Sequence, residues 1–163
     1  MFALTALSQD EFKPHGWAGF KEGTWVKYKR NANLAGLDIE SSTVDKVIKV
    51  TDEEITVEST TEIMGGEHTE TLTFPLKFTT DKAQLEKEGT DTVEVAGKKY
   101  SATIWKYVVK HDGSEITSRI WSNNDSPKNV VLKVESTTKW KVMGQELTVV
   151  IKMKASALND QVK

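Results

Sequence analysis

The sequence predicts an all-β protein, or a β-rich α+β protein, built on one curled antiparallel meander sheet with one short helix. Over residues 92–136, short runs of β-branched and aromatic residues alternate with turn signals, which predicts four consecutive antiparallel strands. Runs such as 55–64 alternate apolar and polar side chains and therefore have one apolar face. A sheet with one apolar face must hide it by curling. The expected shape is a half-barrel or a closed barrel, and a two-sheet sandwich is the alternative.

The length of 163 residues predicts a single domain over residues 1–163. We expect an N-terminal segment over 1–23, the β-sheet over 24–155 and a tail over 156–163. The net charge of −2 provides no global field that would attract nucleic acid or an anionic membrane, and no apolar run is long enough for a membrane span. The absence of cysteine excludes disulfides, thiol nucleophiles and metal sites with cysteine ligands.

The first nine residues, Met1–Gln9, lack the basic region and the full apolar core of a signal peptide, but small residues precede a candidate cleavage point near Ser8 or Gln9. They fit either the end of a signal peptide or an ordinary start of a chain. The first interpretation predicts an exported protein of the periplasm or cell envelope, and the second predicts a cytoplasmic one.

The first half of the chain predicts four strands in order. They cover residues 25–29, 37–50 and 55–64 and, after a turn at Gly65–Gly66, residues 71–79. Pro75 removes a backbone donor from the fourth strand, which therefore lies at an edge or carries a bulge. Residues 80–89 predict the short helix, because Asp81 can cap it, Gln84 occupies the capping-box position and Gly89 can end it.

The second half repeats the pattern of strands and turns and ends in a strand over about 145–154. The pentapeptide 57–61 (Val-Glu-Ser-Thr-Thr) recurs over 134–138, and each copy precedes a Met-Gly turn. The repeat indicates either a duplicated β-meander or a coincidence of common strand residues. Trp121, between Ile120 and the turn at Asn123, is expected to be largely buried.

The strand over 100–111 carries large side chains on both faces. This indicates either a strand that is covered on both sides or an aromatic contact patch formed by Trp105 and Tyr107. The three histidines (His15, His68 and His111) are far apart, and no metal, nucleotide or hydrolase motif occurs. The sequence therefore predicts no cofactor, no metal and no catalytic residue, although folding can still assemble an enzymatic site.

One segment contains, in order, the stretches Val95-Ala-Gly-Lys-Lys-Tyr, Ile104-Trp-Lys-Tyr, Ile120-Trp-Ser-Asn-Asn-Asp-Ser-Pro and Val130-Val-Leu-Lys-Val-Glu-Ser. This segment resembles uncharacterised exported bacterial β-proteins. These proteins are similar to the half-barrel superfamily of lipoprotein localisation (LolA/LppX-like). The resemblance covers residues 92–136 and implies a half-barrel whose better-known members carry acyl chains inside. This chain differs in having no second long helix to plug the barrel.

Three classes of function follow from these observations. The first is a non-enzymatic β half-barrel that binds an apolar ligand, such as a lipid or acyl chain, or a protein partner. The second is a structural or assembly protein with a filled core, and the third is an enzyme whose site forms only in the fold. If a cavity exists, the apolar faces of two strands are expected to line it: Leu72, Phe74, Leu76 and Phe78 on one, and Leu147, Val149, Ile151 and Met153 on the other.

Overall fold

The computed structural model describes residues 20–75, 84–111, 113–125 and 130–159, and every regular element in these ranges is a β-strand. The strands are β1 (Trp25–Leu34), β2 (Leu37–Val50), β3 (Glu54–Ile63), β4 (Gly66–Pro75), β5 (Gln84–Val95), β6 (Lys98–His111), β7 (Ser114–Asn123), β8 (Val131–Val142) and β9 (Gln145–Leu158). The prediction of an all-β fold is therefore confirmed.

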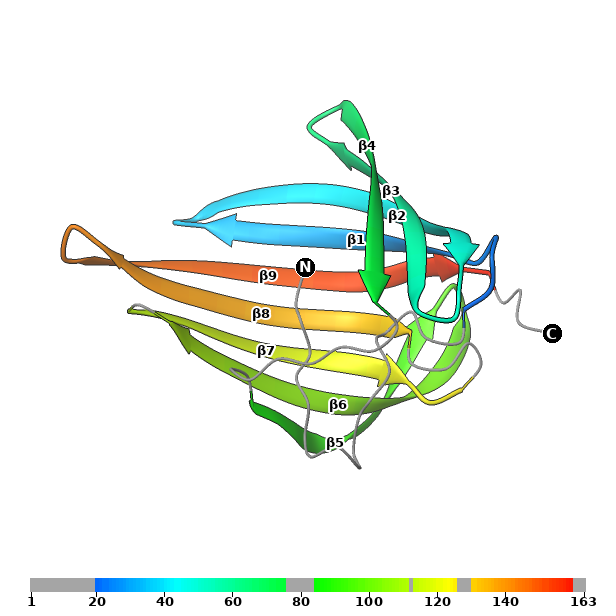
Figure 1. Ribbon diagram of the computed structural model, residues 1–163. Helices are drawn as coiled ribbons and strands as arrows, with labels where there is room; N and C mark the ends of the chain where they lie inside the picture. The colour runs from blue at the N-terminus through cyan, green and yellow to red at the C-terminus, as the bar shows by residue number, and fades with distance from the viewer. Residues whose placement is uncertain (1–19, 76–83, 112, 126–129, 160–163) are drawn as a thin grey trace.

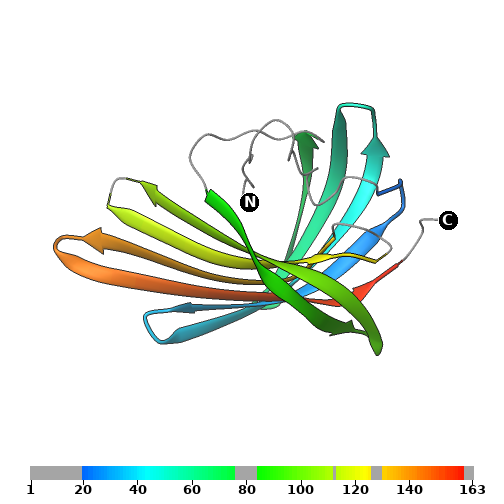
Figure 2. The same cartoon turned by 90° about the horizontal axis from the view of Figure 1, so that it is seen from below.

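All nine strands form a single antiparallel sheet in the order β4-β3-β2-β1-β9-β8-β7-β6-β5 (Figure 1). The chain enters the middle of the sheet at β1 and runs outward to the edge strand β4. It then starts again at the other edge with β5 and returns to the middle, where β9 pairs with β1. Seen from below, the sheet is curved into an open trough (Figure 2). Its two edge strands do not pair, so among the predicted shapes it is a half-barrel.

The sheet curls most strongly at the β5 edge. β5 contacts β8 and β9, although β6 and β7 lie between them in the strand order. This curl brings Val93 and Val95 of β5 into the same buried core as Val26 of β1 and Ala155 of β9. The remaining core residues are Phe20, Tyr28, Val47, Ile55, Val57, Phe74, Tyr100, Ala102, Trp121, Val130 and Leu132. Trp121 is 5% exposed, which confirms its predicted burial.

The position of β4 at an edge confirms the interpretation of Pro75, since an edge strand has no partner for the missing donor. The predicted helix over 80–89 is wrong for residues 84–89, which belong to β5, while 80–83 lie outside the described residues. A helix of ten residues is marginal in water, whereas the open edge of β6 offers residues 84–89 backbone pairing that is interrupted only by a bulge at Glu88. Tertiary pairing therefore overrides the capping pattern.

Four hairpins share one tight turn of two residues, both with positive φ: Ala35–Gly36, Met64–Gly65, Ala96–Gly97 and Met143–Gly144. This is the type I′ pattern, whose twist matches that of the flanking strands. Glycine meets the requirement at the second position. At the first position, alanine and methionine occupy a left-handed conformation that asparagine adopts more readily.

Replacing Ala96 with asparagine is expected to raise the free energy of unfolding by roughly 0.5–1 kcal/mol, because asparagine relieves the left-handed strain. Ala96 is exposed, so the larger side chain meets no packed neighbour. Urea denaturation measures the change. Ala96→Val is the matched control and should destabilise, since β-branched residues avoid positive φ. An Ala96→Asn protein less stable than the parent would contradict this account of the turn.

The repeated pentapeptide lies on β3 and β8, each of which is the third strand of a four-strand meander, β1–β4 or β6–β9. Its serine is buried in both copies and bonds to the residue paired with it on the preceding strand. Ser59 donates to Asp45 Oδ1 at 2.7 Å, and the Ser136 and Ser118 hydroxyls lie 2.8 Å apart. The two halves therefore agree in sequence, strand order and buried polar contacts, as a duplication predicts.

Candidate functional site

The apolar residues of β9 that were predicted to line a cavity lie on one face of this central strand. Val149, Ile151 and Met153 are partly exposed, as is Leu147 beyond them. Strand register extends this face over β8 and β7 to β6. We call the following twelve residues the apolar strip: Met153, Val134, Ile120 and Trp105; Ile151, Ser136, Ser118 and Tyr107; Val149, Thr138, Ile116 and Val109.

The apolar strip contains no charged side chain, and its two buried serines satisfy each other. Its width of three strand spacings is about 14 Å. On the other side of β9, the register continues the same face through Arg30, Ala32 and Leu34 of β1. Leu34 and its partner Leu37 are 42% and 63% exposed. The apolar surface therefore extends as far as the solvent-exposed β1–β2 hairpin. Arg30, paired with Met153, places a cation at the border of the strip.

The predicted aromatic patch on β6 belongs to the apolar strip. Tyr107 is buried, and burial raises the pKa of its phenol. Trp105 is partly exposed and pairs with Ile120. The opposite face of β6 is also covered in part, since Tyr100 is buried. Both faces of this strand therefore pack, and Trp105 is the member of the pair that remains in reach of a ligand.

The predicted cavity residues of the first half lie apart from those of β9. Leu72 and Phe74 are on the edge strand β4, which β3, β2 and β1 separate from β9. Phe74 is a buried core residue, and Leu72 packs against the same core. Leu76 and Phe78 lie outside the described residues.

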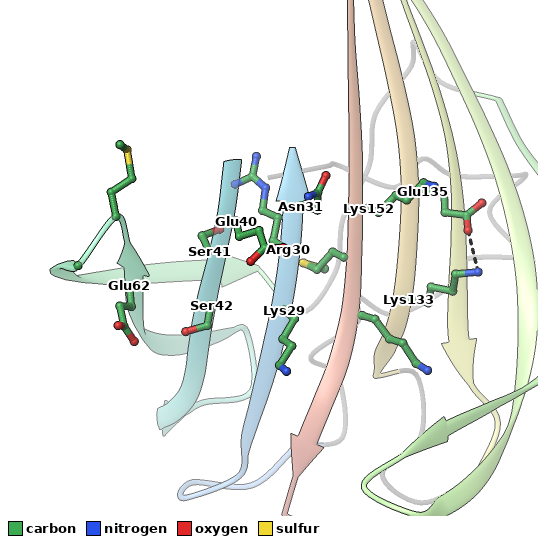
Figure 3. A pocket seen from close by; sticks show the side chains of 14 residues that line it. Lys29, Arg30, Asn31, Glu40, Ser41, Ser42, Glu62, Lys133, Glu135 and Lys152 are labelled. Atoms are coloured by element: carbon green, nitrogen blue, oxygen red, sulfur yellow. Dashed lines mark ion pairs between the residues drawn. The ribbon is translucent and has the colours of Figure 1, made fainter. Parts of the chain in front are cut away.

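A second feature is a cavity of about 630 Å³ whose lining residues are mostly of charged or polar types. Its lining residues are Lys29, Arg30, Asn31, Glu40, Ser41, Ser42, Glu62, Met64, Gly65, Lys133, Glu135, Lys152, Met153 and Lys154. Lys29 lies on β1, between Glu62 on the β3 side and Lys133 on the β8 side (Figure 3). We call this cavity the basic cavity, because it has five cationic side chains and three carboxylates.

Three lysines of the basic cavity are direct neighbours across adjacent strands. Lys154 of β9 pairs with Lys29 of β1 on one side and with Lys133 of β8 on the other. Like charges directly opposite each other destabilise a sheet. Along β9, lysines alternate with Ile151 and Met153, so these lysines lie on the face opposite to the apolar strip.

Lys133 is held in position from two sides. Its Nζ is 2.7 Å from Glu135 Oε1 and 4.2 Å from the centre of the Trp121 ring. The Trp121 indole donates to Asp91 Oδ2 at 2.9 Å, and this hydrogen bond is the main reason why the pKa of Asp91 is lowered. By contrast, no described residue forms an ion pair with Lys29, Lys152 or Lys154.

A partly buried carboxyl group, that of Asp45, lies on β2. Burial raises the pKa of the Asp45 carboxyl above its usual 3.8, Ser59 lowers it through its hydrogen bond, and the charge of Glu70 raises it. Burial, with a smaller effect of Asp45, also raises the pKa of the Tyr28 phenol. The Tyr28 hydroxyl donates to the Val131 carbonyl at 3.0 Å and so ties β1 to the start of β8. The Tyr28 hydrogen bond stabilises the core, whereas burial makes the charged form of Asp45 less favourable in the folded protein.

Sequence reasoning missed the basic cavity. The available signal was the alternation of lysines at 27 and 29 and at 152 and 154, which places two cations on one face of each strand. Within the described ranges, no three His, Cys, Asp or Glu side chains come together as metal ligands. Nor does that part of the chain contain a helix able to cross a membrane.

No protein-family model matches the chain, and no curated protein matches it at the similarity required. Among solved structures, it is similar to an S-type phycobiliprotein lyase from Guillardia theta, with 12% identity over 83% of this chain and 87% of that one and a TM-score of 0.46. It is also similar to a putative outer membrane lipoprotein-sorting protein domain from Vibrio parahaemolyticus, with 9% identity over 85% of each chain and a TM-score of 0.32.

A third similar structure is a DUF1329 family protein from Desulfovibrio piger, with 10% identity over 85% of each chain and a TM-score of 0.27. The lipoprotein-sorting domain is of the kind that the sequence resemblance named. At these identities the likeness concerns the fold alone.

Proposed function

We propose that the protein is a non-enzymatic β half-barrel of the cell envelope that binds an apolar ligand, an acyl chain or a lipid, against the apolar strip. The supporting observation is the continuous charge-free face from β6 to β9, several of whose large side chains remain partly exposed. An ordinary core would bury Val149 and Ile151 completely. Burial of their exposed surface by a ligand contributes about 25 cal/mol per Å².

The ligand is held chiefly by this burial, and an anionic end group is placed at Arg30. The guanidinium is exposed and lies directly across from Met153 at the border of the strip. A carboxylate there gains a cation partner without leaving water. The proposed ligand is therefore an amphiphile whose chain crosses β9 toward Trp105.

Titration with a fluorescent fatty-acid probe tests this function. Saturable binding at micromolar probe is expected, and Ile151→Trp should weaken it about tenfold, because the indole fills the middle of the strip. Val150→Trp is the matched control, since Val150 is the next residue on β9 and faces the other side. It should leave probe binding unchanged.

Circular dichroism and urea denaturation establish that both variants keep the fold. Absence of saturable binding by the parent protein would reject an apolar-ligand function. Equal weakening by Ile151→Trp and Val150→Trp would reject the placement of the ligand on the apolar strip.

A further inference from the structure

The tip of the β3–β4 hairpin is an exposed apolar point beside a group of cations. Met64 is 91% exposed, and Met64 and Gly65 line the basic cavity together with Lys29, Lys133, Lys152 and Lys154. The fold does not require methionine at this position. Met64 has φ of 51°, where asparagine or glycine is less strained, and its side chain packs against no core. Met143 is equally strained and exposed but does not line the basic cavity, so the position of Met64 beside the lysines distinguishes it.

The charges beside Met64 define the chemistry of that partner. Lys29, Lys154 and Lys133 are adjacent across three strands, and Lys29, Lys152 and Lys154 form no ion pair with any described residue. Glu135 is engaged by Lys133 at 2.7 Å. The cavity therefore carries an excess of positive charge, although the whole chain has a net charge of −2. An array of phosphate groups relieves the repulsion between the three paired lysines.

We propose that the basic cavity and the tip of the β3–β4 hairpin form a docking surface for an anionic phospholipid membrane. Met64 enters the interface between headgroups and acyl chains, and the lysines contact lipid phosphates. An apolar point flanked by lysines is the combination that binds lipid surfaces, because burial and attraction to anionic headgroups act together. A site for a soluble phosphate needs the lysines and has no use for an exposed methionine.

Sedimentation of the full chain with vesicles tests this docking surface. The protein is expected to bind vesicles that contain phosphatidylglycerol and not vesicles of pure phosphatidylcholine, with binding lost in high salt. Lys154→Gln should weaken vesicle binding about fivefold, since one lysine at a lipid surface contributes this much. Lys27→Gln is the matched control, because Lys27 shares the strand and face of Lys29 and lies outside the cavity.

Substitution of the methionine tests the apolar part of the docking surface. Met64→Asn should weaken vesicle binding roughly three- to tenfold, by the loss of one buried apolar side chain, while raising stability at its left-handed turn. Met143→Asn is the matched control, since Met143 occupies the equivalent turn of the β8–β9 hairpin, is fully exposed and does not line the cavity. It should raise stability and leave vesicle binding unchanged. Glu62→Gln, which removes a carboxylate from the cavity, should tighten binding.

Three outcomes would overturn the docking surface: no binding to anionic vesicles, equal losses for Lys154→Gln and Lys27→Gln, or equal losses for Met64→Asn and Met143→Asn. Binding of a soluble phosphate ester without vesicle binding would also overturn it, in favour of a small-molecule site. The basic cavity shares Met153 with the apolar strip and Arg30 with its border, but Met64 belongs to the docking surface alone, so Met64→Asn should leave binding of the fatty-acid probe unchanged. Failure of the two proposals can therefore be told apart.

Discussion

Replacing Trp121 with alanine is expected to lower the free energy of unfolding by about 3–5 kcal/mol, the usual loss for a buried tryptophan. Trp121 is 5% exposed and belongs to the main core. Its indole also joins three strands, because it donates to Asp91 of β5 and lies against Lys133 of β8 while it belongs to β7. Alanine leaves a cavity, removes the indole donor of Asp91 and removes the ring that lies against Lys133.

Urea denaturation measures this loss, which corresponds to a drop of about 10 °C in melting temperature. Trp140→Ala is the matched control: Trp140 is partly exposed on β8 and should cost less than about 2 kcal/mol. Trp121→Phe separates the contributions, since it keeps an aromatic ring and loses the indole donor. A loss below about 1 kcal/mol for Trp121→Ala would mean that the neighbouring strands close over the site.

The individual strands could be predicted because their side-chain alternation is local. Ile55, Val57 and Ser59 alternate with polar residues in the sequence, and they are the buried residues of β3 in the structure. The turns at Gly97 and Gly144 could be predicted for the same reason, since positive φ at a tight turn selects glycine. The edge position of β4 follows from one residue, Pro75.

The pairing of β1 with β9 could not be predicted in this way. It joins Val26 to Leu158, and no local pattern encodes a contact over that separation. The strand β5 was missed because the capping pattern of residues 80–89 favours a helix locally, whereas the free edge of β6 exists only in the folded sheet. Local propensity is a weak prior when such an edge is available.

Of the two candidate binding surfaces, the apolar strip could be predicted in part from a local pattern, and the basic cavity could not. The alternation of Val149, Ile151 and Met153 indicates an apolar face of β9, and the structure places it on one face of the sheet. The basic cavity depends on the registers of β1, β8 and β9, which bring Lys29, Lys133 and Lys154 side by side. In the sequence, each of these lysines is indistinguishable from an ordinary solvated lysine. The excess of positive charge arises only when folding brings them together.

Replacing Ser59 with alanine is expected to cost about 1.5–3 kcal/mol at neutral pH, because Ser59 donates the hydrogen bond that supports the carboxylate of Asp45. Asp45 is partly buried, and burial already raises its pKa above 3.8. Since the folded state holds the proton of Asp45 more tightly than the unfolded state, this group lowers stability as the pH rises from about 3.8 through its folded pKa. Loss of the serine donor raises that pKa further and enlarges the decline.

The loss caused by Ser59→Ala should therefore be smaller in acid, where Asp45 is neutral in both states, at about 0.5–1.5 kcal/mol. Ser136→Ala provides the matched control at the equivalent place in the second half. Its partner Ser118 is neutral, so its cost should be about 1 kcal/mol at every pH. Urea denaturation from pH 3 to pH 8 measures both. An identical, pH-independent loss for the two variants would show that Ser59 stabilises the core by packing and that its hydrogen bond to the ionised Asp45 contributes nothing.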